Sequence, residues 1–269
     1  MTASIRSVER ALHVLECFET EQKALSLTQI ADHLGMAKST VFRLLATLEN
    51  SRFVNRNGET GLYHLGTRLI HMGAVASQYG DVPQWAQPHL ERLAAEYGET
   101  VDLAILDGAN VMYIRVVESP QRVKLSAAVG QRLPAFCTAS GKAFLAYMPE
   151  AQVASLLAGQ LRQYTPATRT DFADLIRDLQ QTRERGFAMS EQEYEKDINA
   201  VGAPVLNAQH VPVFAVAITG PSFRLPLERM LALGPALRAA TATMALEAGM
   251  TTLSAIASKA ANSGATGRN

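Results

Sequence analysis

Residues 25–64 read LSLTQIADHLGMAKSTVFRLLATLENSRFVNRNGETGLYH, and this stretch decides the fold of the N-terminal part of the chain. It holds two segments whose apolar residues recur at helical spacing: Leu27, Ile30, Ala31 and Leu34 in the first, and Val41, Leu44, Leu45 and Leu48 in the second. Ser26 and Gln29 have the spacing of a capping box, and Gly35 ends the first segment. Two helices joined by a short turn that contains glycine predict a helix-turn-helix, whose second helix enters the major groove of DNA.

The polar face of the second predicted helix carries side chains that suit DNA recognition. A rotation of about 100° per residue places Ser39 and Arg43 opposite the apolar stripe, with Thr40 and Thr47 beside them and Lys38 at the helix start. Arginine makes bidentate contacts to guanine, and serine, threonine and lysine reach phosphates or base edges. We therefore predict that these five residues contact DNA. A small helical bundle with a solvated polar face is the alternative that the pattern leaves open.

The residues after the second helix predict a β-hairpin of the kind that forms the wing of a winged helix. Phe53-Val54 is a short apolar strand, Asn57-Gly58 is a tight-turn signal, and residues 62–65 form the return strand. Arg56 lies beside the turn, where a wing meets the DNA backbone or the minor groove, so it joins the predicted DNA contacts. Residues 33–56 carry four basic side chains and one acidic one, whereas residues 1–64 balance at seven of each. The basic charge is therefore local, and strong nonspecific DNA binding by one subunit is not expected.

The composition of the whole chain excludes several classes of protein. The 269 residues suggest about two domains, and 48% hydrophobic residues suffice for ordinary cores. No apolar run approaches the roughly 20 residues of a membrane helix, and MTASIRSVER shows no secretion signal. The two cysteines, Cys17 and Cys137, are far apart, so we expect a protein of the reduced cytoplasm with no membrane partner. No cysteine and histidine cluster has zinc spacing, so neither a metal nor a cofactor is predicted.

Helical patterns flank the predicted winged helix. One face of residues 7–18 is apolar, which predicts a first helix packed on the helix-turn-helix through Val8, Ala11, Leu12, Leu15 and Phe18. Residues 65–79, LGTRLIHMGAVASQY, keep helical spacing with few charges and predict a connecting helix. Its apolar side packs either against a partner subunit or against the second domain of its own chain, and the sequence leaves both open.

A break at Asp81-Val82-Pro83 begins a second domain of mixed helices and strands. Strand patterns at 101–106, 111–117 and 123–129 predict an antiparallel meander, and two further strands are expected at 201–206 and 213–219. Helix patterns occur at 85–97, 143–147, 149–157, 171–185 and 227–250, the last one interrupted or kinked at Gly234-Pro235. Residues 251–269 are rich in Ala, Ser, Thr and Gly without an apolar stripe, which predicts a mobile tail.

The segment Thr138-Ala-Ser-Gly-Lys142 places small residues at a predicted helix start. Small side chains expose backbone N–H groups, which together with the helix dipole suit an anion. The segment is not a nucleotide-binding loop of the GxxxxGK type, because the upstream glycine is missing. Plain capping of the helix by Thr138 is the alternative.

Over residues 5–249 the chain resembles the IclR family of bacterial transcription regulators. SVERALHVLECF, SLTQIADHLGMAKSTVFRLLATL and YHLGTRL resemble the winged helix and linker of that family, and VGQRLPAFCTASGKAFLA resembles its effector-domain core. The most specific match is the signature spacing of Gly186, Ser190, Glu193, Ala200, Val201, Gly202, Val205 and Asn207, from which Leu206 departs. The resemblance implies a homodimer or homotetramer that binds double-stranded operator DNA and senses a small carboxylate through a GAF/PAS-like domain.

The resemblance also implies which residues bind the effector. The family's ligand contacts match the helix start at Ala139, Ser140 and Gly141, and further positions at Ser190, Ala200, Ala217 and Thr219. Ala200 and Ala217 stand where relatives that bind small ketoacids have hydrogen-bonding side chains. We therefore expect an aromatic or medium-sized acid as the effector of a catabolic operon, with backbone N–H groups and the hydroxyls of Ser190 and Thr219 as donors, and with Lys142 at most assisting.

Two other functions would use Cys137. An enzyme with an accessory DNA-binding domain would need this thiol as its nucleophile, close to a helix start that lowers its pKa. A redox sensor would need it to be oxidised, although no resolving cysteine lies near it in the sequence. A buried small apolar residue is the plainer interpretation of Cys137, and we predict that the chain is not an enzyme.

The sequence thus predicts an α+β protein with four parts. Residues 1–65 form a winged helix-turn-helix DNA-binding domain, 66–81 a linker helix, 82–250 a GAF/PAS-like effector-binding domain with an antiparallel sheet, and 251–269 a mobile tail. Whether the protein activates or represses transcription is left open.

Overall fold

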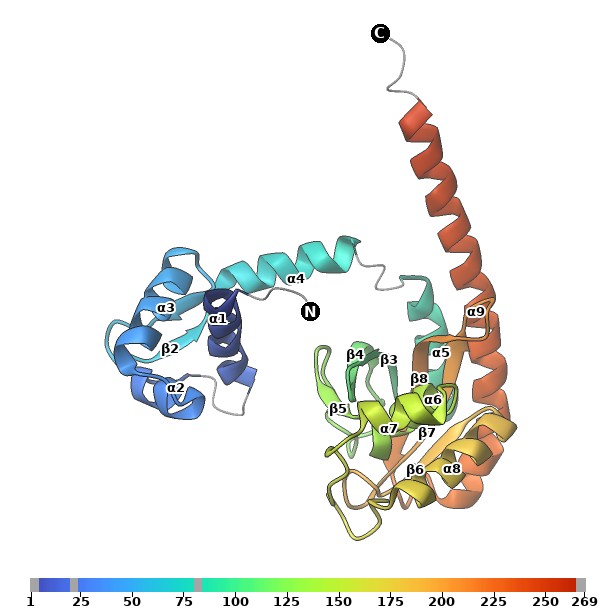
Figure 1. The fold of residues 1–269 in the computed structure, drawn as a ribbon. Coiled ribbons are helices and arrows are strands. Elements are labelled where there is room, and N and C mark those ends of the chain that lie inside the picture. Colours follow the sequence, from blue (N-terminus) through green and yellow to red (C-terminus); the bar gives the residue numbers. More distant parts are fainter. Residues whose placement is uncertain (1–4, 20–23, 80–83, 265–269) are drawn as a thin grey trace. The chain divides into compact units, whose positions relative to one another are not determined.

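The computed structural model describes residues 5–19, 24–79 and 84–264, drawn in colour in Figure 1. The chain divides into two compact units, Met1–Asp81 and Val82–Asn269. None of the helices in the described ranges is long and apolar enough to cross a membrane.

The first unit is a winged helix. Its elements are α1 (Arg6–Glu16), a short 3₁₀ turn (Cys17–Glu19), α2 (Leu27–Leu34), α3 (Lys38–Asn50), β1 (Val54–Arg56), β2 (Tyr63–Leu65) and α4 (Thr67–Tyr79). β1 and β2 pair as an antiparallel hairpin. The order of helices and hairpin confirms the predicted winged helix-turn-helix, followed by a linker helix.

Local signals set the break between α2 and α3. The Ser26 hydroxyl accepts from the backbone N–H of Gln29, whose side chain accepts from the Ser26 N–H, so the predicted capping box is present. Gly35 ends α2 at φ 60°, in the left-handed region that glycine enters at no steric cost. Ile30, Val41 and Leu45 then meet in a buried core with less than 1% exposure.

Two details of this unit differ from the prediction. Val8 and Leu12 of α1 are 53% and 52% exposed, because the helix turns Val14 into the core instead. The hairpin does not close as a two-residue turn at Asn57-Gly58. The side chain of Asn57 accepts from the N–H groups of Glu59 and Thr60, and Gly61 takes the left-handed conformation at φ 70°, so the loop is longer.

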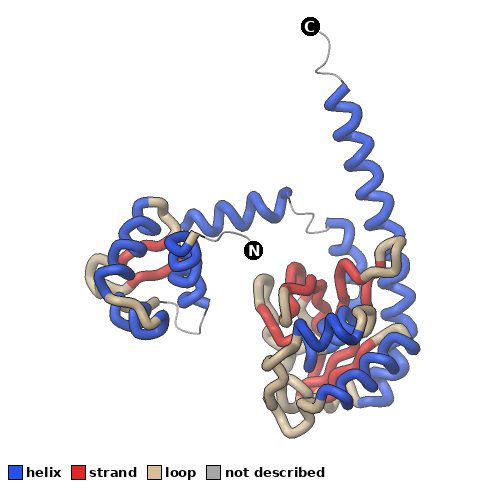
Figure 2. Tube along the Cα trace, viewed as in Figure 1, coloured by secondary structure: helices blue, strands red, loops and turns tan. Residues whose placement is uncertain are grey.

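The second unit is built on one six-stranded antiparallel sheet with strand order β5-β4-β3-β8-β7-β6. The strands are β3 (Thr100–Asp107), β4 (Asn110–Val117), β5 (Arg132–Pro134), β6 (Ala188–Glu191), β7 (Ile198–Leu206) and β8 (Pro212–Pro221). β3 and β8 lie at the centre of this order with β4 and β7 beside them, and Figure 2 draws the strands in red. This arrangement confirms the predicted α+β class with an antiparallel sheet.

Helices cover both faces of the sheet. On one face α5 (Gln87–Tyr97) and α9 (Leu227–Gly264) pack against a core that includes Val101, Val216 and Ile218. On the other face lie α6 (Ala139–Leu145), α7 (Glu150–Leu156) and α8 (Phe172–Arg185), with a core that includes Ala104 and Ala215. Side chains alternate along a strand, so neighbouring residues of β8 belong to different cores.

Two expectations for this unit are wrong, and one strand was not predicted. Residues 123–129 are not a strand; Val123 and Val129 are 61% and 64% exposed, and the short β5 pairs with β4 instead. The strand that was not predicted is β6, which forms within residues 187–199, FAMSEQEYEKDIN, a segment rich in acidic side chains. α9 continues through Pro235 to Gly264, so residues 251–264 are helical where a tail was expected, and residues 265–269 lie outside the described part.

Candidate functional site

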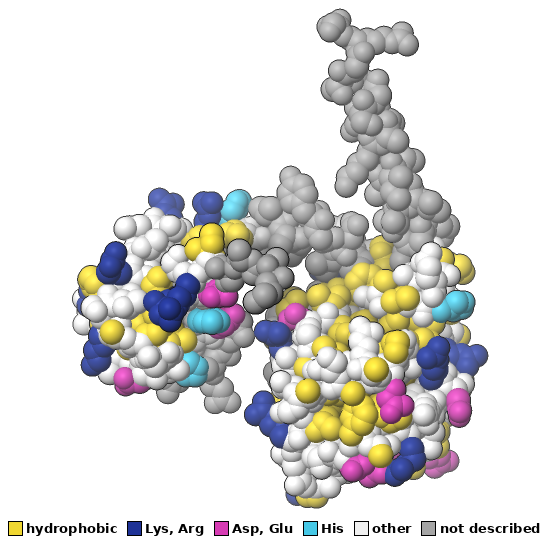
Figure 3. All heavy atoms as spheres, in the orientation of Figure 1, with side chains coloured by type: hydrophobic (Ala, Val, Ile, Leu, Met, Phe, Trp, Pro, Cys, Tyr) yellow, Lys and Arg dark blue, Asp and Glu magenta, His cyan; other side chains and the backbone are white. Residues whose placement is uncertain are grey.

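The recognition helix α3 separates an apolar face from a polar one as predicted. Val41, Leu45 and Leu48 are buried, whereas Lys38, Ser39, Arg43 and Thr47 are exposed and Thr40 is half-buried. The Thr47 hydroxyl donates to the Arg43 backbone carbonyl over 2.9 Å, so its hydrogen is already used within the helix. In Figure 3 the Lys and Arg side chains of this unit occur at several separate places on the visible face, in keeping with its balanced net charge.

Phe42 is a surface residue of α3 that the sequence analysis did not select. Its side chain is 51% exposed, next to Arg43. An exposed aromatic ring on a helix that is predicted to enter the major groove suits the methyl group of thymine. The sequence did contain a signal for this exposure, because Phe42 lies outside the apolar stripe of the helix.

Arg56 is exposed, but contacts within the wing hold it. Its guanidinium lies 5.6 Å from the centre of the Tyr63 ring, and its Nε donates to the Gly61 carbonyl over 3.5 Å. These weak contacts direct the arginine along the hairpin, and the charge stays available to a phosphate.

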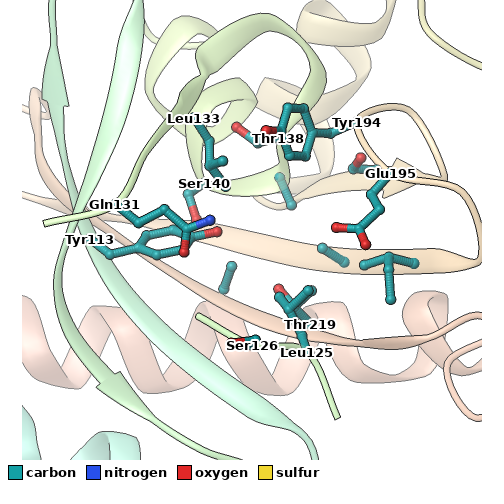
Figure 4. A pocket seen from close by; sticks show the side chains of 15 residues that line it. Tyr113, Leu125, Ser126, Gln131, Leu133, Thr138, Ser140, Tyr194, Glu195 and Thr219 are labelled. Carbon is teal, nitrogen blue, oxygen red and sulfur yellow. The ribbon is translucent and has the colours of Figure 1, made fainter. Parts of the chain in front are cut away.

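The second unit contains a pocket on the α6 face of the sheet, with a cavity volume of about 60 Å³. One water molecule needs roughly 10–15 Å³ on this scale, so the cavity holds a few waters or one small organic molecule. Its walls are shown in Figure 4 and consist of Tyr113, Leu125, Ser126, Gln131, Leu133, Thr138, Ala139, Ser140, Ser190, Tyr194, Glu195, Ile198, Ala200, Ala217 and Thr219. None of these lining residues is a lysine or an arginine.

Strand register brings the predicted effector residues together. Ser190 of β6 pairs with Ala200 of β7, which pairs with Thr219 of β8, so the three form one row across the sheet. In the next row Gly202 pairs with Ala217, which pairs with Asp102 of β3. Because paired residues share a face, both rows lie beneath the start of α6.

Close packing fixes the start of α6 on this floor. A Cβ atom on Gly202 would lie 2.7 Å from the carbonyl carbon of Ala139, so only glycine lets β7 approach so closely. Thr138 caps the helix: its hydroxyl accepts from the Gly141 N–H over 3.3 Å, and its carbonyl accepts from the Lys142 N–H. Capping of the helix by Thr138, the alternative that the sequence left open, is therefore observed. Of the three predicted backbone donors, Ala139 and Ser140 remain, and both line the pocket.

Three predicted contributors have other partners. The Ser190 hydroxyl donates to the Cys137 carbonyl over 3.0 Å, so the expectation that it donates to the effector is wrong. Gly141 is not among the lining residues, and Thr138 occupies its N–H.

Lys142 is fully buried, and its Nζ lies 2.7 Å from both Asp178 Oδ2 and Glu193 Oε1. The sequence analysis allowed Lys142 at most an assisting part, and the structure gives it none: Lys142 does not line the pocket, and its charge joins α6 to α8 and to the β6–β7 segment.

Buried polar groups stand behind the pocket surface. Ser140 Oγ donates over 3.0 Å to Oδ1 of Asp102, which is 1% exposed. Burial raises the pKa of Asp102 to about 7, and the hydrogen bond from Ser140 opposes this shift. Burial, and then the charge of Asp102, raise the pKa of Tyr113 well above its usual value. In Figure 4, Tyr113, Gln131 and Ser140 lie at one side of the pocket.

Asp102 and Tyr113 were missed by the sequence analysis. Both lie in strands that the sequence analysis predicted. That their side chains lie on the pocket side of the sheet depends on the pairing of β3 with β4 and β8. The loop residues Leu125 and Ser126 were also missed, because the segment around them has the alternation of a strand and lines the pocket instead.

Cys137 does not have the properties of a nucleophile. Its side chain is fully buried, and burial followed by the charge of Glu193 raises its pKa to about 12. A thiol of this kind is protonated at neutral pH, so the environment opposes both functions that would use Cys137. The described residues include no group of three or more histidine, cysteine or acidic side chains placed to hold a metal.

Comparison with known proteins agrees with both units. Residues 7–58 match the family described as IclR helix-turn-helix domain, and residues 74–245 match Bacterial transcriptional regulator IclR C-terminal. The chain is 36% identical over 216 residues to the HTH-type transcriptional regulator XynR of Escherichia coli strain K12, covering 80% of this chain and 86% of XynR. It is 32% identical over 234 residues to the HTH-type transcriptional repressor AllR of that strain, covering 87% and 86% of the two chains.

A solved structure extends the agreement to the fold. The crystal structure of an IclR transcriptional regulator from Alicyclobacillus acidocaldarius matches with a TM-score of 0.80 at 33% identity, covering 91% of this chain and 99% of that one. The relatives are named regulators and repressors of transcription, not enzymes. The winged helix, the pocket domain and these matches together show that the chain belongs to the IclR family of bacterial DNA-binding transcriptional regulators.

Proposed function

We propose that this regulator controls a catabolic operon in the bacterial cytoplasm and senses a small organic acid, of aromatic or medium size, in the α6 pocket. The observation that carries the proposal is the composition of the pocket wall. Ala200 and Ala217 form its floor, and Leu125, Leu133 and Ile198 add apolar surface. A ring or short alkyl chain placed there would gain about 25 cal/mol for each Å² of apolar surface buried.

The carboxylate of the effector would meet neutral donors. The N–H groups of Ala139 and Ser140 line the pocket, and the hydroxyls of Thr219 and Tyr113 have no hydrogen-bond partner among the described residues. A neutral set of donors suits a single carboxylate and disfavours a multiply charged anion, because no basic residue lines the pocket.

The DNA-binding surface in this proposal comprises Lys38, Ser39, Thr40, Arg43 and Thr47 of α3 together with Arg56 of the wing. One such surface reads only a few base pairs, so tight binding needs two copies on a palindromic or repeated operator. The linker helix α4 would supply part of the dimer or tetramer interface, since Ile70 and Met72 are 75% and 46% exposed. Sedimentation that shows a monomer at micromolar concentration, with full DNA affinity, would contradict this assembly.

The proposed sensing function is tested with the full chain and its selected DNA. Duplexes that the protein retains from a random pool would define the operator, and a gel-shift assay would then be repeated with acids of increasing size. We expect aromatic and medium-sized acids to change operator affinity and to raise the melting temperature more than glyoxylate or pyruvate does. If glyoxylate has the larger effect, the assignment from Ala200 and Ala217 fails.

A further inference from the structure

The serine and threonine hydroxyls from the α6 start and β6 that line the pocket already donate their single hydrogens to the protein. Ser140 donates to Asp102 Oδ1 over 3.0 Å, and Ser190 donates to the Cys137 carbonyl over 3.0 Å. Thr138 donates to the Pro134 carbonyl over 2.9 Å and also accepts from Gly141. Because a hydroxyl has one donor and two acceptor lone pairs, Ser140 and Ser190 can offer a ligand only lone pairs.

The direction of the Ser140 hydrogen bond is fixed by its partner wherever Asp102 is ionised, which is above its pKa of about 7. Asp102 is 1% exposed, and an ionised carboxylate accepts hydrogen bonds but donates none. The groups facing this carboxyl are Ser140 from α6, Tyr113 from β4 and Ala217 from β8, and none of them carries a positive charge. Lys142, although it follows Ser140 closely in α6, is paired with Asp178 and Glu193.

We infer that the effector is a hydroxylated acid whose hydroxyl hydrogen is donated to Ser140 Oγ, and that Asp102 is the residue that sets this preference. The inference rests on the proposed acid-sensing function and adds the chemical class of the ligand. An acid without a hydroxyl, or one whose oxygen is methylated, would leave the Ser140 lone pair facing an apolar group. A site built to bond a hydroxyl discriminates strongly against an analogue that lacks it.

The test measures dissociation constants of the full chain by calorimetry at a pH of about 8.5, where Asp102 is ionised. The probes are benzoate and hexanoate, each compared with its hydroxy derivatives and with the matching methoxy derivatives. For at least one hydroxyl position we expect the hydroxy acid to bind about tenfold or more tightly than both its parent and its methyl ether. Equal or tighter binding by the parent or the ether at every position overturns the inference.

Variants connect the preference to the named residues. Ser140→Ala removes the acceptor, and alanine already occupies the preceding position, so the preference for the hydroxy acid should fall to about two- to threefold. Asp102→Asn offers Ser140 an N–H donor beside the remaining oxygen acceptor, so the Ser140 hydrogen is no longer committed to this side chain and the affinity for the methoxy acid should rise relative to the hydroxy acid. Ser155→Ala, an exposed serine on α7, is the control and should retain the wild-type ratio.

The possible outcomes distinguish a failure of this inference from a failure of the proposed sensing function. A hydroxyl preference that survives both Ser140→Ala and Asp102→Asn shows that other residues read the hydroxyl, and the inference is then wrong while acid sensing stands. If no acid of either series binds, the proposed sensing of organic acids is itself wrong. If acids bind without any hydroxyl preference, sensing stands and only the ligand class assigned here fails.

Discussion

Ser140 Oγ donates to Oδ1 of Asp102 over 3.0 Å, so a pocket-lining hydroxyl is bonded to a carboxyl group that is 1% exposed. The carboxyl lies on the central strand β3, with no basic partner among the groups that face it. Ionising such a group costs free energy in the folded protein, which connects the pocket to the pH dependence of stability.

The first prediction concerns Asp102→Asn. Burial raises the pKa of Asp102 from 3.8 to about 7, so the folded protein holds this proton more tightly than the unfolded chain. Asp102 is therefore neutral in both states well below pH 4, and its ionisation destabilises the folded state progressively as the pH rises from about 4 to about 7. The variant should be more stable than wild type at pH 8, by a few kcal/mol at most, and this difference should vanish toward pH 4.

Melting temperatures of both proteins between about pH 4 and pH 8 check this prediction. Glu184→Gln is the control, since it removes a carboxylate from an exposed position of α8 in the same unit, and it should follow the wild-type curve. A difference between Asp102→Asn and wild type that is independent of pH would show that Asp102 does not titrate in this range.

The second prediction concerns Arg43→Ala. Arg43 is exposed on the polar face of α3, so its removal should leave the melting temperature nearly unchanged. Loss of a bidentate base contact should cost about 1–3 kcal/mol per half-site, seen as weaker operator binding in a gel-shift assay. Arg122→Ala removes the same charge from an exposed loop of the second unit and should bind like wild type. Wild-type operator affinity of Arg43→Ala would exclude α3 as the recognition helix.

The third prediction concerns Lys142→Met. The buried ammonium lies 2.7 Å from both Asp178 and Glu193, and its loss leaves two buried carboxylates with fewer partners. We expect a loss of about 3–5 kcal/mol in unfolding free energy, measured by urea denaturation. Lys196→Met, at an exposed position, should change stability by less than about 0.5 kcal/mol. Equal effects of the two substitutions would mean that the buried ion cluster does not stabilise the fold.

Features set by nearby residues could be predicted from the sequence. The capping box at Ser26 and Gln29 and the left-handed Gly35 involve residues within a few positions of one another. Helical spacing likewise placed Val41 and Leu45 inside and Arg43 outside. These signals need no knowledge of the remainder of the fold, which is why the winged helix could be predicted in detail.

Features set by long-range pairing could not. Asp102 comes under the pocket because β3 pairs with β8, more than a hundred residues later. The segment that ends at Lys142 has the composition of an anion site. The charge of Lys142 is nevertheless paired with Asp178 and Glu193, which come from separate segments of the chain. Residues 123–129 alternate like a strand, but they form a loop from which Leu125 and Ser126 line the pocket. Alternation indicates that one side of a segment is covered, and it does not identify the covering element.

Composition misled the prediction at the C-terminus. Residues 251–264 lack an apolar stripe, which indicated a tail, but they are helical. Alanine has the highest intrinsic helix propensity, and a helix that is already formed extends with one hydrogen bond per added residue. Propagation from the packed part of α9 therefore accounts for the helix between residue 251 and Gly264.

The last prediction concerns Gly202→Ala, which tests whether the contact between β7 and α6 shapes the pocket. The added Cβ would lie 2.7 Å from the Ala139 carbonyl carbon and 3.0 Å from the Ser140 N, so the start of α6 must move. We expect a loss of about 1–3 kcal/mol in stability, with a larger loss of effector affinity, because the displaced residues line the pocket. Gly73→Ala in α4 is the control: nothing lies within 4 Å of its added Cβ, and alanine should stabilise the helix by about 0.5–1 kcal/mol. Operator binding without effector should survive Gly202→Ala, since the winged helix is a separate compact unit. Wild-type effector affinity together with a wild-type melting temperature would show that β7 does not position the start of α6.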